Sequence, residues 1–148
     1  QGIGEILTPL KPLPTLAIAL AHFPFAVATK DVFSRLQPKD CNGSSTAAFL
    51  AAWDKGLWLE ALQKGSNSLE KVTQHLVPDI LLWKQWFLHK QAVTSAMSGS
   101  GPTVFGVFTD GDALKSLSDG CPPNGSILGC RLHNEGIAME GKTVGESQ

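Results

Sequence analysis

The sequence predicts an α+β fold of the split βαβ, or ferredoxin-like, type, in which helices cover one face of an antiparallel sheet. Apolar runs typical of buried strands stand on both sides of a long central segment in which apolar residues recur at helical spacing. The expected order is β, several helices, β, β, α, β. The four strands are placed at residues 15–22, up to Met97, at 103–108 and at 126–132.

The first strand and the helix after it are short and sharply bounded. Thr15–His22 is a compact apolar run, and Pro24 ends it. Thr29 is a suitable N-cap for a helix with one apolar face. The apolar residues of that helix are Val32, Phe33 and Leu36.

The central segment, Thr46–Lys90, is expected to consist of separate helices. Its apolar residues recur at intervals of three and four positions, as on one face of a helix. Gly56, Gly65 and Pro78 interrupt this pattern. Asn67 and Ser68 can cap the helix that begins near Leu69.

The C-terminal part contains one further helix and a tail. Asp110 is expected to cap a helix that extends through Leu117, and the last strand follows it. From Glu135 onward no periodic apolar face is visible, which predicts a mobile tail over 135–148. The expected domain is therefore 1–134.

Composition excludes several classes of partner. The 148 residues suit one domain, and a net charge of -1 without a basic excess argues against nucleic acid. The three cysteines lack metal-binding spacing and their odd number favours a reducing compartment, so a cytoplasmic protein is expected. The apolar stretch 13–25 looks like the core of a signal peptide, but it is too short to span a membrane. No membrane partner and no metal site are expected.

A glycine-rich segment, Ser98–Gly101, stands out between the two middle strands. It is no ordinary phosphate loop, because Pro102 and Thr103 occupy the positions where that motif needs Lys and Ser or Thr. It is no dinucleotide fingerprint either, because a strand rather than a helix follows it. Two interpretations stay open: a tight turn between antiparallel strands, or a backbone that approaches a ligand or another phosphate-binding loop closely.

Three stretches, taken in order, resemble one family: GIGEILTPL (2–10), VATKDVF (27–33) and MSGSGPTVFGVF (97–108). They are similar to the C-terminal half of the 4-diphosphocytidyl-2-C-methyl-D-erythritol kinases, which belong to the GHMP kinase superfamily. The resemblance implies a GHMP kinase C-terminal domain. It also implies transfer of a phosphoryl group from ATP, with Mg²⁺, to the 2-hydroxyl of a cytidine diphosphate derivative in non-mevalonate isoprenoid biosynthesis.

The resemblance assigns roles to individual residues. Ser98, Gly99, Ser100 and Gly101 match the family's third motif, a loop that supports the phosphate-binding loop at the ATP site. Phe33 matches an aromatic residue that stacks on cytosine, and its alternative is a core residue of the short helix. Thr29 matches a residue near that ligand, and its alternative is the helix cap. The segment AHFPFAV (21–27) is bulkier than the family's pattern, which leaves the shape of the cytidine pocket open.

The family's catalytic Asp and Lys belong to its N-terminal kinase domain and are expected upstream of Gln1. The resemblance therefore implies that the chain has no catalytic residue of its own, is inactive alone and needs that domain as partner. It is either a fragment or a truncated relative. Two alternatives stay open: a non-catalytic ligand-binding or regulatory module, and a GHMP kinase for another small alcohol.

Overall fold

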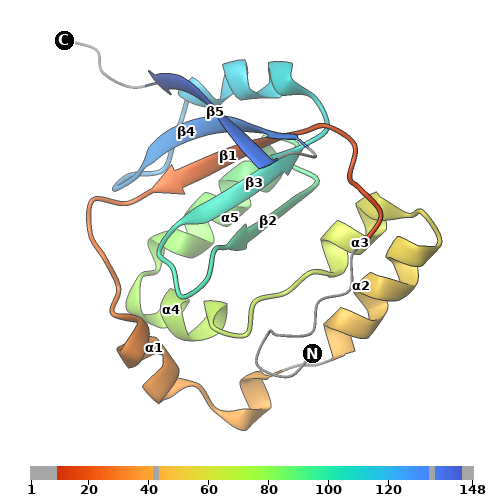
Figure 1. The fold of residues 1–148 in the computed structure, drawn as a ribbon. Coiled ribbons are helices and arrows are strands. Elements are labelled where there is room, and N and C mark those ends of the chain that lie inside the picture. The colour runs from red at the N-terminus through yellow and green to blue at the C-terminus, as the bar shows by residue number, and fades with distance from the viewer. Residues whose placement is uncertain (1–9, 42–43, 134–135, 145–148) are drawn as a thin grey trace.

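The computed structural model describes residues 10–41, 44–133 and 136–144, and it shows one five-stranded sheet with helices packed on it (Figure 1). The elements in chain order are β1 (Leu16–His22), α1 (Thr29–Arg35), η1 (Pro38–Asp40), α2 (Ser44–Asp54), α3 (Trp58–Lys64), α4 (Glu70–Leu76), α5 (Asp79–His89), β2 (Thr94–Met97), β3 (Val104–Phe108), η2 (Gly111–Ser118), β4 (Ser126–His133) and β5 (Gly136–Val144).

The sheet has the strand order β2-β3-β1-β4-β5, and each neighbouring pair is antiparallel. β1 lies in the middle, where Leu20 is opposite both Phe105 of β3 and Leu128 of β4. The order of the first four strands is that of the split βαβ arrangement, so the predicted fold class is confirmed.

β5 differs from the sequence-based expectation of a tail without regular structure. Residues Gly136–Val144 form a strand that pairs with β4, from His133 opposite Gly136 to Ile127 opposite Val144. Every residue except proline offers a backbone donor and acceptor to such a ladder, so an edge strand requires no strong apolar pattern. The sheet therefore continues past residue 134, while residues 135 and 145–148 lie outside the described part of the chain.

The main core lies between the sheet and α5, which is behind the sheet in Figure 1. Ile80, Trp83 and Phe87 recur at intervals of three and four residues on α5 and are fully buried. A Cβ on Gly106 of β3 would come within 2.8 Å of the Phe87 ring. The absence of a side chain at this position therefore lets α5 pack directly on the sheet.

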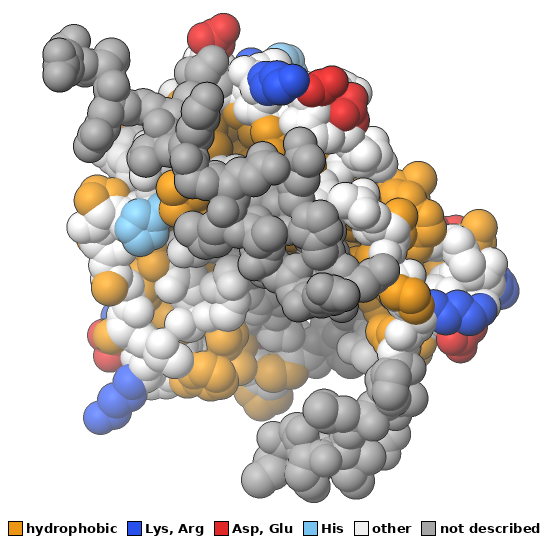
Figure 2. Space-filling view, turned by 45° about the horizontal axis from the view of Figure 1, so that its top comes forward, with side chains coloured by type: hydrophobic (Ala, Val, Ile, Leu, Met, Phe, Trp, Pro, Cys, Tyr) orange, Lys and Arg blue, Asp and Glu red, His pale blue; other side chains and the backbone are white. Residues whose placement is uncertain are grey.

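The predicted helix breaks are confirmed, and they place a second small cluster away from the main core. Gly56 separates α2 from α3, Gly65 caps the C-terminus of α3, and Pro78 precedes α5. α2 and α3 pack on each other around Ala52, Trp53 and Ala61. This helix pair lies beside the sheet in Figure 1, and Figure 2 shows hydrophobic side chains among charged ones on that side of the molecule.

None of the helices described here is both long and apolar enough to cross a membrane.

Candidate functional site

The glycine-rich segment Ser98–Gly101 forms the turn between the antiparallel strands β2 and β3. The Ser98 amide donates to the Thr103 carbonyl at 2.9 Å, and the Gly101 amide donates to the Ser98 carbonyl at 2.9 Å. Gly99 and Gly101 have φ angles of 56° and 83°. These values are costly for residues with a side chain, so the glycines permit this turn.

The two glycines differ in their surroundings. A Cβ on Gly101 would lie 2.5 Å from the Met97 sulfur and 3.1 Å from Cγ2 of Thr73, whereas a Cβ on Gly99 would meet nothing within 4 Å. Gly101 therefore packs closely against its own domain. Gly99 is at the exposed tip of the turn.

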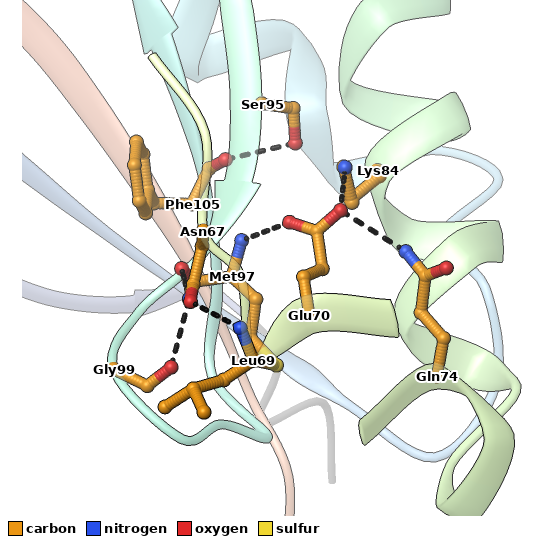
Figure 3. A network of polar contacts seen from close by, with 9 residues as sticks. All are labelled: Asn67, Leu69, Glu70, Gln74, Lys84, Ser95, Met97, Gly99 and Phe105. Atoms are coloured by element: carbon orange, nitrogen blue, oxygen red, sulfur yellow. Dashed lines mark hydrogen bonds and ion pairs between the residues drawn. The ribbon is translucent and has the colours of Figure 1, made fainter. Parts of the chain in front are cut away.

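Asn67, just before α4, binds this turn through its side-chain amide (Figure 3). Its side-chain nitrogen donates to the carbonyl oxygens of Met97, at 2.9 Å, and Gly99, at 2.8 Å. Its side-chain oxygen accepts from the Leu69 amide at 3.0 Å. Leu69 itself is the N-cap of α4, so Asn67 bonds to the cap residue instead of being the predicted cap. Because both ends of the amide group are engaged, its orientation is defined by its partners.

Glu70 and Thr73 of α4 add two further contacts to the strand end and the turn. The Glu70 carboxylate accepts from the Met97 amide at 3.0 Å and is held in turn by Gln74 and by an ion pair with Lys84 of α5 (Figure 3). The side chains of Glu70 and Lys84 are only 14% and 20% exposed. The Thr73 hydroxyl lies 3.2 Å from the carbonyl oxygens of both Ser100 and Leu69, so its one proton is shared between them.

These contacts engage carbonyl groups of the turn and leave two of its backbone N–H groups available as donors. Asn67 and Thr73 engage the carbonyls of Met97, Gly99 and Ser100. Among the described residues, no acceptor is bonded to the amides of Gly99 and Ser100. Successive free backbone N–H groups in a turn with positive φ angles can bind an anionic oxygen, so the backbone here is suited to phosphate.

Thr29 lies at this turn, although it is not the helix cap that its sequence context predicts. Ala28 is the N-cap of α1, with no side-chain hydrogen bond, and Thr29 is the first helical residue. The Thr29 hydroxyl oxygen lies 2.8 Å from the hydroxyl oxygen of Ser100. The capping prediction is therefore wrong because this hydroxyl bonds to a distant turn instead of to its own helix.

Phe33 lies on α1 four residues after Thr29, which is one helical turn further along. Phe33 is 56% exposed, whereas the neighbouring Val32 is fully buried. The interpretation of Phe33 as a core residue is therefore wrong. An aromatic ring left in solvent on the helix that meets the turn is compatible with ligand stacking.

Sequence reasoning did not identify Glu70, Thr73 or Lys84 as part of the site. The helical spacing predicts the helix of Glu70 and Thr73, but it does not show which side chains face the turn.

Among the residues that the structure describes, no three His, Cys, Asp or Glu side chains are grouped as a metal site. Burial raises the pKa of the Cys121 thiol, which lies away from the turn beside the end of η2.

A model of the family described as "GHMP kinases C terminal" matches residues 48–122, which include α4, α5 and the turn. The chain belongs to this family. The assignment agrees with the α+β architecture and with the position of the glycine turn between two strands. The stretch GIGEILTPL, which also carries the resemblance, lies outside the described residues except for Leu10.

Two curated relatives of this GHMP kinase domain carry the same protein name. A protein from Rhizobium johnstonii, named 4-diphosphocytidyl-2-C-methyl-D-erythritol kinase, is 36% identical over 118 residues, which are 80% of this chain and 38% of the relative. A protein of the same name from Alkaliphilus metalliredigens is 35% identical over 134 residues, 90% of this chain and 45% of the relative. The chain thus spans less than half the length of these relatives.

Solved structures of two small-molecule kinases share the fold. A crystal structure of 4-(cytidine 5'-diphospho)-2C-methyl-D-erythritol kinase superposes with a TM-score of 0.67 at 24% identity, over 95% of this chain and 48% of the other. The mevalonate kinase of L. major superposes with a TM-score of 0.66 at 16% identity, over 86% of this chain and 45% of the other. At these identities the likeness is one of fold.

Proposed function

We propose that this domain is the C-terminal part of an ATP-dependent kinase that phosphorylates the 2-hydroxyl of 4-diphosphocytidyl-2-C-methyl-D-erythritol. The observation that carries the proposal is the turn at Ser98–Gly101, whose carbonyls are engaged by Asn67 and Thr73 while the Gly99 and Ser100 amides have no acceptor among the described residues. The name shared by the relatives at 35% and 36% identity supports the choice of substrate.

The chain's own residues fit a supporting role at a phosphate site. The free amides of the turn would donate to anionic oxygens of the nucleotide or to the backbone that holds it. The rigid attachment to α4 matters because preorganised donors need no rearrangement when charge develops. ATP supplies the phosphoryl group when bound, and Mg²⁺ would neutralise its oxygens through groups outside this chain.

α1 would contribute to binding of the phosphate acceptor. Phe33 presents an exposed ring on which a cytosine base could stack, and such stacking is worth about 1–3 kcal/mol per base. Thr29 connects the start of that helix to Ser100 in the turn. The acceptor's base and the phosphate site would therefore be held by one connected surface.

The catalytic Asp and Lys would come from an N-terminal kinase domain, so the 148-residue chain alone would be inactive. The test is an assay for ATP-dependent phosphorylation of 4-diphosphocytidyl-2-C-methyl-D-erythritol with two proteins. One is the chain alone, and the other is the chain joined behind the N-terminal part of the Rhizobium johnstonii relative. Activity is expected only from the joined protein.

The assay also distinguishes the alternatives. Robust activity of the isolated chain would disprove the upstream location of the catalytic pair. A folded joined protein that phosphorylates mevalonate or homoserine but not the cytidine derivative would favour a GHMP kinase for another alcohol. Absence of activity with all three substrates, with ligand binding retained, would favour a non-catalytic module.

A further inference from the structure

A hollow lined by charged side chains lies on the side of α4 that faces away from the glycine turn. Its volume is about 260 Å³, and it is formed where the end of α1, the short helix η1 and α4 meet. The side chains that line it include Arg35, Lys39, Asp40, Lys71, Val72 and His75. None of these residues takes part in the site described above.

The side chains that line the hollow carry more positive than negative charge. Arg35, Lys39 and Lys71 face a single carboxylate, that of Asp40, which accepts a hydrogen bond from the Gln37 amide. In the described part of the chain, none of the three cations forms an ion pair, whereas Lys64, Lys84 and Lys115 each do. Convergence of like charges is unfavourable and raises the local concentration of anions.

This local excess is not a general property of the molecule. The chain as a whole has a net charge of -1, with 12 Lys and Arg against 13 Asp and Glu. Yet residues from three separate elements bring three permanent cations into one concave space. The His75 ring is held against its own helix, because its Nδ1 lies 2.6 Å from the Lys71 carbonyl oxygen and must donate to it.

Helix geometry separates this hollow from the turn. Successive residues of an α-helix are about 100° apart around the axis, so Glu70 and Thr73 lie on one side of α4 and Lys71 and His75 on another. The first pair contacts Met97 and Ser100. The second pair lines the hollow, so the same short helix has one face at the turn and another at a cationic site.

We propose that this hollow binds the phosphate group of a small molecule, separately from the proposed nucleotide site. Arginine is suited to phosphate because its guanidinium group can donate two parallel hydrogen bonds. The volume is below the usual range of about 300–1,000 Å³ for pockets of drug-sized ligands, which favours inorganic phosphate or a small phosphate monoester. A bound phosphate would link α1 and η1 to α4, and α1 is the helix that carries Thr29 and Phe33.

The test is a titration of the 148-residue chain with inorganic phosphate and, separately, with glycerol 3-phosphate, at constant ionic strength maintained with chloride. The ring resonances of His75 report on the hollow by NMR. Saturable shifts are expected, and Arg35→Gln or Lys71→Gln should weaken binding about tenfold, the loss typical of one charged hydrogen bond. Tighter binding of glycerol 3-phosphate would identify a monoester as the ligand, and equal or tighter binding of inorganic phosphate would identify the free ion.

Two further variants make the test specific. Lys55→Gln removes one exposed cation after α2, outside this hollow, and should leave the affinity unchanged. Asp40→Asn removes the opposing carboxylate and should tighten binding. Shifts that do not saturate with either ligand, equal weakening by Lys55→Gln and Lys71→Gln, or weaker binding by Asp40→Asn would each overturn the proposal. None of these readouts depends on kinase activity, so the result is independent of the proposed function.

Discussion

Thr29 and Ser100 are 71 positions apart in the sequence, and their hydroxyl oxygens lie 2.8 Å apart in the structure. Thr29 begins α1, and Ser100 is in the turn between β2 and β3. The family resemblance implies separate roles for these two regions, one near a cytidine ligand and one in support of a phosphate loop. Their direct contact joins them into one candidate site.

This contact predicts coupled effects of two substitutions. Thr29→Val and Ser100→Ala should each lower the free energy of unfolding by less than about 1 kcal/mol, because the hydrogen bond is exposed. The double variant should cost no more than the larger single effect, since both changes remove the same bond. Urea denaturation of all three variants measures this, with Ser34→Ala, which removes another exposed hydroxyl from α1, as control. Fully additive losses would contradict the contact.

Asn67 should be the most sensitive polar residue around the turn. Asn67→Ala removes the donor to Met97 and Gly99 and the acceptor for the Leu69 amide, so a loss of about 3 kcal/mol is expected at about 1 kcal/mol per bond. Denaturation monitored by tryptophan fluorescence gives the free energy of unfolding. Gln85→Ala, at an exposed position of α5, is the control and should change little. Equal stability of Asn67→Ala and the control would show that the three hydrogen bonds of Asn67 do not stabilise the turn in solution.

Gly99 and Gly101 should respond differently to the same substitution. Gly99→Ala places a Cβ in open space at a φ of 56°. The only expected loss is therefore the cost of about 1 kcal/mol that a left-handed backbone conformation imposes on alanine. Gly101→Ala adds a contact of 2.5 Å to the Met97 sulfur, and we expect a total loss of about 3 kcal/mol. Thermal and urea denaturation compare the two variants. A Gly101→Ala protein as stable as Gly99→Ala would mean that the turn does not pack on Met97 in solution.

Glu70 should contribute far more to stability than an exposed glutamate in a similar ion pair. Glu70→Gln leaves the Lys84 ammonium without its carboxylate in a region where that side chain is only 20% exposed, and a loss of about 2 kcal/mol is expected. Glu60 forms an exposed pair with Lys64, and Glu60→Gln should cost less than about 0.5 kcal/mol. Chemical denaturation at low and high salt measures both. A Glu70→Gln effect as small and as salt-sensitive as that of Glu60→Gln would show that the Glu70–Lys84 ion pair is not shielded from solvent.

Substitution of Phe33 should affect ligand binding, whereas substitution of its neighbour Val32 should affect folding. Phe33→Ala should change the free energy of unfolding by less than about 0.5 kcal/mol, because the residue is 56% exposed. Val32→Ala removes a fully buried side chain and should cost about 2 kcal/mol. In the joined enzyme, Phe33→Ala should weaken binding of cytidine 5'-diphosphate at least tenfold, which calorimetry can measure. Unchanged affinity would remove the reason to assign cytosine stacking to this ring.

Much of the architecture could be predicted from local sequence patterns. The apolar run of β1, the spacing of Ile80, Trp83 and Phe87, and the breaks at Gly56 and Pro78 are local signals, and each element lies where they place it. β5 was missed because pairing at a sheet edge uses backbone groups that every sequence offers. The Thr29 cap was assigned wrongly because its hydroxyl had two possible partners, and sequence shows only the near one.

The sequence by itself determined the first four strands, the division of the central segment into helices, the family resemblance and the importance of the glycine turn. Only the tertiary structure decided which groups engage that turn. Asn67, just before α4, and Glu70 and Thr73 of α4 reach it from about 30 positions away along the chain, because packing of α5 on the sheet brings the preceding helix against the end of β2. The convergence of Arg35, Lys39 and Lys71 is likewise a result of packing. Distances between residues far apart in sequence depend on how whole elements pack, and no local pattern encodes them.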